Sequence, residues 1–305
     1  MKKSLIWLIV IVVILVIIYF VIKGTEPKLE RGEGSGFEGF TTEDVTKIET
    51  TSPAGENDVT LERDDVWELS YPIEYTADDK AIERLFTSLT DMKFVTIVSE
   101  NPQKQDIFEV TEETGRDIKI YAGDKLVLHF FVGKTDQTNM NTYIREANSD
   151  KVFAVQGNIS YVFNRPIDQW RDKAIVSIPE NDHQQLEVTW GDTTVVYTLI
   201  DSLWSIVQDD EYMELHQNKL FSIIKSFSPL RASGFQDEPV ELDWGDPDVV
   251  LDIHSLSGNE YVCRFIKKDD KQFYAKQDNN EQVYLVSKYV ADKFKKKFSD
   301  YQNVQ

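Results

Sequence analysis

The chain has 305 residues, 41% of them hydrophobic and 12% aromatic, which is enough for one large or two ordinary folded domains and too much for a disordered tail. Acidic residues outnumber basic ones by 53 to 33, and the net charge is −20. A surface of that charge repels phosphate backbones, so no nucleic-acid partner is expected. The single cysteine, Cys263, excludes an intramolecular disulfide, and its alternating apolar surroundings predict a buried thiol.

The N-terminus carries an uncharged apolar segment that begins at Leu5 and ends at Ile22. As a helix with ~1.5 Å rise per residue it spans ~27 Å, close to the hydrocarbon thickness of a bilayer. A cleaved signal peptide is the alternative, but its apolar region is shorter and ends in a small-x-small site, which is missing here. Residues 1–23 are therefore expected to form a cytoplasmic stub and a transmembrane anchor in contact with the lipid bilayer.

Positive charge before the anchor sets its predicted orientation. Lys2 and Lys3 precede the apolar segment, and positive flanks stay in the cytoplasm. We therefore expect a single-pass protein of the cell membrane with a cytoplasmic N-terminus and extracytoplasmic C-terminal domains. Residues 24–43 are rich in glycine and are expected to form a flexible linker.

Residues 44–173 are predicted to form a first α+β repeat. A helix is expected from Ala77, with Thr76 as its N-cap, and a short helical segment at residues 161–170. The first helix carries an apolar stripe at helical spacing, made of Ile82, Leu85, Phe86, Leu89 and Met92. Short alternating segments predict strands at residues 45–51, 59–63, 66–71, 94–99, 116–122, 126–132, 141–145 and 152–155.

Residues 174–305 are predicted to repeat this order. Strands are expected at residues 185–190, 193–199, 204–207, 249–254, 260–266, 272–276 and 283–286. A helix stripe that ends at Pro229 consists of Leu220, Ile223, Ile224 and Phe227. A terminal helix is expected to carry Val290, Phe294, Phe298 and Tyr301.

Several residues keep their place in both repeats, at an offset of about 130 residues, as a duplicated unit would. The matches are Trp67 with Trp204, Leu85-Phe86 with Leu220-Phe221, Tyr143 with Tyr274, Val152-Phe153 with Val283-Tyr284, and Tyr161-Val162 with Tyr289-Val290. Strands joined by short turns favour antiparallel pairing. The predicted fold class is α+β: an N-terminal transmembrane helix and two tandem repeats, each a mainly antiparallel sheet with one packed helix and a C-terminal helix.

One set of residues in the first repeat forms a family pattern. It comprises Trp67-Glu68-Leu69-Ser70-Tyr71-Pro72, Ala77-Asp78, Leu85, Leu89, Phe94, Val132-Gly133-Lys134, Tyr143, Val152-Phe153-Ala154-Val155 and Trp170-Arg171-Asp172-Lys173. In this pattern, and in the anchor before it, the chain resembles the bacterial family called domain of unknown function 4340. The resemblance covers residues 45–173 well and the second repeat in outline, and Phe108-Glu109-Val110 departs from the Gly-Leu that often follows an aromatic residue there.

The resemblance implies an envelope-facing membrane protein, often encoded beside ABC-type transporters of the gliding-motility kind. The family has no established catalytic residues, so none can be carried over to this chain.

Motifs that would indicate chemistry fail on their spacing. Gly133-Lys134-Thr135 resembles the end of a P-loop, but Leu128 stands where that motif needs glycine, so a turn after the preceding strand is expected. No Gly-x-Ser-x-Gly elbow is present. No two histidines fall at metal-ligand spacing on one predicted element, and His129 is expected to be a satisfied core or edge residue; the four are His129, His183, His216 and His254.

Three other features have both a structural and a functional interpretation. The acidic run from Asp243 to Asp248 suggests either a Ca²⁺ loop or, because it lacks EF-hand spacing, a solvated turn. The basic run Lys293, Lys295, Lys296 and Lys297 indicates a solvated helix face or a contact with an acidic partner. Trp67, Trp170 and Trp204 are expected to be core anchors rather than a glycan-stacking site.

The sequence thus predicts no catalytic, cofactor-binding or metal-binding residue. The favoured function is a non-enzymatic, membrane-anchored extracytoplasmic binding or accessory protein of an ABC-type transporter complex, with the ABC permease as its membrane partner. The alternative is an envelope hydrolase that acts on glycan or peptide through surface carboxylates. A passive envelope spacer is a third possibility.

Overall fold

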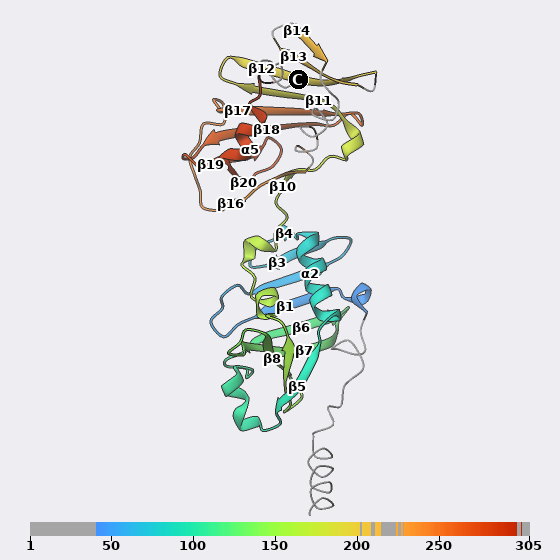
Figure 1. Ribbon diagram of the computed structural model, residues 1–305, viewed down its shortest axis with the longest axis vertical. Coiled ribbons are helices and arrows are strands. Elements are labelled where there is room, and N and C mark those ends of the chain that lie inside the picture. The colour runs from blue at the N-terminus through green and yellow to red at the C-terminus, as the bar shows by residue number, and fades with distance from the viewer. Residues whose placement is uncertain are drawn as a thin grey trace, which may run out of the picture. The chain divides into compact units, whose positions relative to one another are not determined.

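The computed structural model (Figure 1) describes residues 41–201, 203–208, 211–214, 224, 227, 229–297 and 300. Within them the chain is mainly antiparallel β with few helices, and two large sheets hold most of the strands, which confirms the prediction of mainly antiparallel sheets. The chain divides into two compact units between Arg171 and Asp172, and each unit is described by itself. The division expected from the sequence lies two residues further along the chain.

The predicted anchor and most of the predicted linker lie outside the described residues. Among the residues that are described, no helix has both the length and the apolar character needed to cross a membrane.

The first unit is built on a nine-stranded sheet in which all neighbouring strands are antiparallel. Their order is β4-β3-β2-β1-β6-β7-β8-β9-β5. The strands are β1 (Lys47–Thr51), β2 (Val59–Arg63), β3 (Trp67–Tyr71), β4 (Tyr75–Thr76), β5 (Phe94–Ser99), β6 (Arg116–Ala122), β7 (Lys125–Thr135), β8 (Asn141–Glu146) and β9 (Val152–Gln156).

Helix α2 (Asp79–Thr90) lies against this sheet (Figure 1) and provides one side of the core. Its stripe packs as predicted, with Ile82, Leu85 and Leu89 buried in the same cluster as sheet residues such as Ile48. The Trp67 ring lies 5.7 Å from the ring of Phe86. The remaining helical segments are short: α3 (Ser160–Phe163) and the 3₁₀ turns η1 (Thr42–Asp44), η2 (Pro102–Phe108) and η3 (Ile167–Gln169).

Two predicted helix features of the first unit are corrected. The N-cap of α2 is Asp78 rather than Thr76, because the Asp78 carboxylate accepts a hydrogen bond from the Ala81 backbone N–H at 2.9 Å. The segment expected to be helical at residues 161–170 is two short turns, α3 and η3, separated by Pro166. Proline has no N–H to donate and its ring crowds the preceding turn, so a helix cannot continue through it.

Gly133-Lys134-Thr135 belongs to β7 itself and does not form the predicted turn. The strand continues because Gly133 has no side chain: a Cβ there would meet the Phe108 carbonyl oxygen at 2.1 Å. The chain turns only after the strand, where the Asp136 carboxylate accepts hydrogen bonds from the backbone N–H groups of Thr138 and Met140.

The second unit contains a nine-stranded antiparallel sheet with the order β14-β13-β12-β11-β17-β18-β19-β20-β16 and a two-stranded sheet, β10-β15. The 3₁₀ turn η4 (Glu180–Asp182) leads into the larger sheet. The strands are β10 (Ala174–Val176), β11 (His183–Trp190), β12 (Thr193–Ile200), β13 (Leu203–Gln208), β14 (Glu211–Glu214), β15 (Leu230–Arg231), β16 (Gly234–Gln236), β17 (Val249–Ser255), β18 (Glu260–Lys267), β19 (Gln272–Gln277) and β20 (Val283–Ser287).

Helix α5 (Lys288–Phe294) packs on β19 and β20 of this sheet. Its Phe294 is buried and stacks on Phe227, with the ring centroids 4.4 Å apart, and Phe265 lies beside them. Of the residues predicted for helix stripes in this unit, Ile224 and Phe227 are buried. Four further residues predicted for these stripes lie outside the described residues: Leu220, Ile223, Phe298 and Tyr301.

The two nine-stranded sheets share one strand order when their strands are numbered along each unit. The registers agree as well: Ile48 pairs with Leu61 and Ile120, and Leu186 pairs with Tyr197 and Ile253. Counted outward from these pairs, three pairs of aromatic residues occupy equivalent positions: Trp67 and Trp204, Tyr143 and Tyr274, and Phe153 and Tyr284.

Predictions about single buried residues are confirmed. Trp67, Trp170 and Trp204 are all buried, as expected of core anchors. Cys263 is fully buried on β18, and burial raises the pKa of its thiol to about 12. A thiol in that state is a packing group and not a nucleophile.

Candidate functional site

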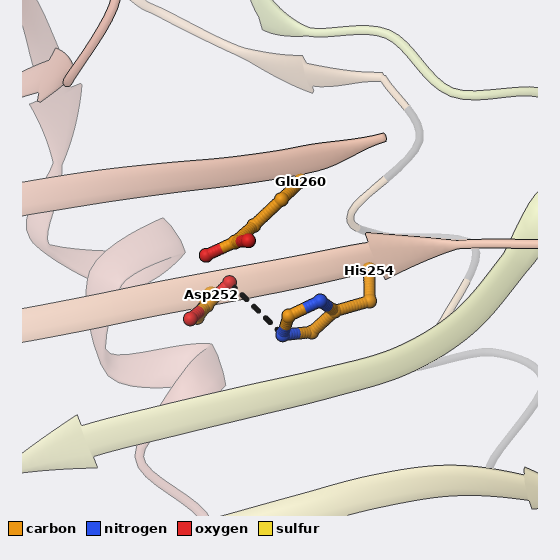
Figure 2. A group of neighbouring side chains, drawn as sticks. All are labelled: Asp252, His254 and Glu260. Carbon is orange, nitrogen blue, oxygen red and sulfur yellow. Dashed lines mark ion pairs between the residues drawn. The ribbon is translucent and has the colours of Figure 1, made fainter. Parts of the chain in front are cut away.

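Three side chains with metal-binding groups converge on one face of the second sheet: Asp252 and His254 from β17, and Glu260 from β18 (Figure 2). Successive side chains of a strand point to opposite faces. Leu251 and Ile253 therefore enter the core and are fully buried, while Asp252 and His254 share the other face. Glu260 joins them because it is the direct antiparallel partner of His254.

The three groups are close enough to share one ligand. His254 Nε2 lies 3.4 Å from Asp252 Oδ1, and one ligand atom of each residue lies within 4.8 Å of the other two. Donor atoms around a tetrahedral Zn²⁺ ion, with bonds of about 2.0–2.2 Å, stand about 3.3–3.6 Å apart. Asp252 and His254 are half-buried and Glu260 is exposed.

Two carboxylates share one imidazole in this cluster. Burial raises the pKa of the Asp252 carboxyl above its usual value; His254 opposes this rise, and the negative charges of Glu260 and Asp278 add to it. Within the described part of the chain, Oδ1 of Asp252 is buried and has no hydrogen-bond donor, and its ion-pair partner is His254. Glu187 on β11 lies directly opposite Asp252 and contributes a further carboxylate to the same face.

The hairpin between β17 and β18 fixes the position of Glu260. The Asp182 carboxylate accepts hydrogen bonds from the backbone N–H and the hydroxyl of Ser257, at 2.9 and 2.7 Å. The Ser255 hydroxyl oxygen accepts a hydrogen bond from the Asn259 N–H at 2.9 Å. These bonds tie down the loop that immediately precedes Glu260, so β18 begins at a defined place.

The equivalent positions of the first sheet are occupied differently. The shared register places Lys119, Tyr121 and Leu126 where the second sheet has Asp252, His254 and Glu260. There the carboxylates are satisfied by protein groups: Glu49 Oε1 lies 2.8 Å from Lys47 Nζ, and Glu49 Oε2 accepts a hydrogen bond from the Tyr121 hydroxyl at 2.9 Å.

Asp117, also on the first sheet, is satisfied in the same way. Its carboxylate oxygens lie 3.0 Å from Lys119 Nζ and 2.7 Å from His129 Nε2. The prediction that His129 is a satisfied histidine is therefore confirmed.

The other histidines do not join a cluster. His183 is buried, and within the described part of the chain neither of its ring nitrogens has a hydrogen-bond partner. Burial lowers the pKa of His183, while the charges of Asp182 and Glu180 oppose that fall. His216 lies outside the described residues.

The acidic run from Asp243 to Asp248 forms an exposed turn. Asp243 accepts a hydrogen bond from the Gly245 N–H, and Asp248 accepts one from the Lys267 N–H, so these carboxylates are used by backbone donors. Among the described residues, the group formed by Asp252, His254 and Glu260 is the one with metal-ligand geometry.

An open hollow of about 540 Å³ lies beside Gly133 and Lys134, between Arg116 and Ser160. Its buried cation is already in use. The Arg116 guanidinium donates hydrogen bonds to the Asn164 side chain, the Glu56 carbonyl and the Thr50 hydroxyl. Since these bonds hold the loop around Glu56 in place, the Arg116 guanidinium is not available to bind a ligand in the hollow.

The cluster escapes a search of the sequence for two histidines on one element. The available signal was the Asp252-x-His254 spacing, since residues two apart on a strand share a face. Both predicted strands, residues 249–254 and 260–266, are present in the structure. What the sequence could not supply is the register that sets Glu260 opposite His254.

A comparison with protein families finds a match over residues 67–247, more than half of the chain, to the model described as Domain of unknown function (DUF4340). The chain belongs to this family. The match to DUF4340 runs from β3 of the first unit to the turn before β17 of the second, so the resemblance noted in the sequence is confirmed. Asp252, His254 and Glu260 lie beyond the matched residues. Neither curated proteins nor solved structures gave a match.

Proposed function

We propose that this DUF4340 protein is a membrane-anchored, non-enzymatic binding or accessory protein on the extracytoplasmic side of the cell membrane, serving an ABC-type transporter complex. The observation that carries the proposal is the uncharged segment from Leu5 to Ile22 behind Lys2 and Lys3. This segment has the length and flanking charge of an anchor that exports the C-terminal part of its chain. The transporter part of the proposal comes from what the family resemblance implies, namely an envelope-facing membrane protein often encoded beside ABC-type transporters.

We also infer that the exported part is a duplicated α+β unit, with repeats at residues 44–173 and 174–305. The shared strand order and register of the two nine-stranded sheets support this inference. A duplicated unit presents two related sheet faces that have diverged: one has carboxylates paired with lysines, and the other has the His254–Asp252 pair beside Glu260. That divergence is expected when one copy keeps a structural role and the other binds something.

The proposal is tested by affinity purification of the full-length chain from gently solubilised membranes, followed by mass spectrometry. The control is the same chain with residues 5–22 replaced by an unrelated transmembrane segment, which keeps the topology and changes only the contacts within the bilayer. A permease and its ATPase recovered at near-stoichiometric amounts with the native chain would support the accessory role. Recovery of the chain alone, under conditions that preserve other transporter complexes, would contradict it.

One observation favours the alternative of an envelope hydrolase. Asp252 and Glu260 have carboxylate oxygens within 4.8 Å of each other, and burial raises the pKa of Asp252, as in acid–base pairs of glycosidases. Against it, Glu260 is exposed on a sheet face, and hydrolases enclose such a pair with substrate-binding walls. Turnover of cell-wall glycan by the native chain, abolished in Asp252→Asn, would establish the hydrolase instead.

A further inference from the structure

We propose that Asp252, His254 and Glu260 bind a divalent transition-metal ion of the Zn²⁺ type on the face of the second sheet that lies opposite Leu251 and Ile253. This inference goes beyond the accessory role and does not depend on it, because it concerns only groups within the second unit.

The donor set selects the class of ion. Imidazole together with carboxylate is a combination that Zn²⁺ and neighbouring divalent transition metals accept. Ca²⁺ and Mg²⁺ prefer oxygen ligands. Because His254 offers nitrogen, only two of the three side chains would suit those ions. Three protein ligands leave at least one position for water or for a group from a bound partner.

A second observation points to a missing cation. Among the described residues, Oδ1 of Asp252 is buried without a hydrogen-bond donor, and its ion-pair partner is His254 Nε2 at 3.4 Å (Figure 2), while the Asp252 side chain as a whole is 27% exposed. A buried carboxylate oxygen normally has a donor or a metal ion. Two positive side chains on the neighbouring strands β18 and β19 already have partners, since Arg264 makes two hydrogen bonds to Asp278 and Lys276 pairs with Glu281.

The first sheet shows what the same face looks like without a metal. Its equivalents of Asp252 and His254 are Lys119 and Tyr121, and both serve as partners of carboxylates. In the second sheet an acid and an imidazole replace these two groups, so the lysine and tyrosine partners are gone, two ligands are added, and Asp252 has His254 as its ion-pair partner. The two changes together favour an external cation over a residual structural pair.

The backbone positions of the three ligand residues are set by the fold itself. Asp252 and His254 lie on a strand paired on both sides, by β11 and β18, and the hairpin network around Asp182 and Ser257 holds the start of β18. Ligands placed on paired strands need only side-chain rotation to close on an ion, which lowers the entropy cost of binding.

The test uses the full-length chain in detergent, purified with a tag that contains no histidine and stripped with a chelator. Zn²⁺ alone is titrated by calorimetry, and Co²⁺ is added as a spectroscopic substitute whose visible absorption reports coordination. The variants are His254→Ala and Glu260→Gln. The matched control is His129→Ala, which removes a histidine of the equivalent sheet face that sits beside one aspartate and has no third ligand.

We expect one Zn²⁺ per native chain, binding at least tenfold weaker in His254→Ala and in Glu260→Gln, and unchanged binding in His129→Ala. Glu260 is exposed, so Glu260→Gln keeps the test valid even if His254→Ala folds poorly. The proposal is overturned if the native chain binds no Zn²⁺, if both cluster variants bind as tightly as the native chain, or if His129→Ala abolishes binding. Binding of Ca²⁺ in preference to Zn²⁺ would also overturn it.

Discussion

The effect of Asp252 on the free energy of unfolding is expected to depend on whether a cation is bound. Burial raises the pKa of its carboxyl, so the folded state holds the proton more tightly than the unfolded state does. For such a group, stability is greatest below the unfolded pKa of about 3.9 and is lost as the pH rises through the folded pKa. At neutral pH without metal, the ionised Asp252 is therefore a destabilising group.

Asp252→Asn is accordingly expected to raise the melting temperature of chelator-treated protein at pH 7, by a few degrees at most. At pH 3.5 the gain should vanish. Added Zn²⁺ should stabilise the native chain and leave the variant unchanged. Thermal unfolding followed by circular dichroism measures all three, and a variant that melts lower than the native chain at pH 7 without metal would contradict this account of Asp252.

His183 makes the opposite kind of contribution. Its pKa is lowered by burial, against the pull of Asp182 and Glu180, so the unfolded chain takes up a proton at a higher pH than the folded chain. Stability from a neutral His183 is present above the unfolded pKa of about 6.5 and falls as the pH drops below it, with a limiting slope of about 1.4 kcal/mol per pH unit.

His183→Leu should remove that part of the pH dependence between pH 7 and pH 5, whatever its effect on stability at pH 7. Denaturant unfolding at several pH values measures the slope. His129→Gln is the control, because His129 is held by Asp117 at a half-buried position. If the unfolding free energy changed with pH equally steeply in the native chain and in His183→Leu, the pKa of His183 would be the same in the folded and unfolded states, and this explanation would be wrong.

The start of α2 tests how an element is specified. Asp78→Ala removes the carboxylate that caps Ala81 N–H and is expected to cost about 1 kcal/mol of unfolding free energy. Thr76→Ala alters an exposed residue that caps nothing and should change stability by less than about 0.5 kcal/mol. Urea unfolding measures the loss of unfolding free energy in both variants. A larger loss in Thr76→Ala than in Asp78→Ala would indicate that Thr76 is the N-cap, as predicted from the sequence.

Strand β7 tests a close approach of backbone to backbone. Gly133→Ala would place its Cβ 2.1 Å from the Phe108 carbonyl oxygen, and η2 would have to move, at a cost of about 3 kcal/mol. Gly234→Ala in β16 is the matched strand glycine, because its nearest neighbour, Leu285 Cδ1, would lie 3.9 Å away. Its effect should be below about 1 kcal/mol. Comparable costs for the two variants, measured by urea unfolding, would contradict the steric explanation.

The elements that were predicted well are those with their own periodicity. Strands β2 and β6 begin and end where alternation of apolar residues places them, and α2 follows its stripe. Very short strands such as β4 and β15 were missed, because two residues carry no period and are defined by the strand beside them. The cluster of Asp252, His254 and Glu260 was missed for the same reason, since the register between strands decides which residues meet.

The whole molecule combines an expected anchor with two sheets of one topology, and its charge is consistent with an exported domain. A chain of this charge repels anionic lipid headgroups, because acidic residues exceed basic ones by 53 to 33. The anchor segment would hold this acidic domain at the membrane, and the linker would set its reach. A partner would then contact the folded units rather than the lipid surface.

The orientation of the chain is the claim on which this account depends most. Cys263 is the single cysteine and is buried, so the folded native chain is not expected to react with thiol reagents. Asp270→Cys places a thiol at a side chain that is 96% exposed. In spheroplasts, a membrane-impermeant maleimide is expected to label Asp270→Cys fully and the native chain not at all. Labelling of Asp270→Cys only after the membrane is broken would place the folded units in the cytoplasm and contradict the account.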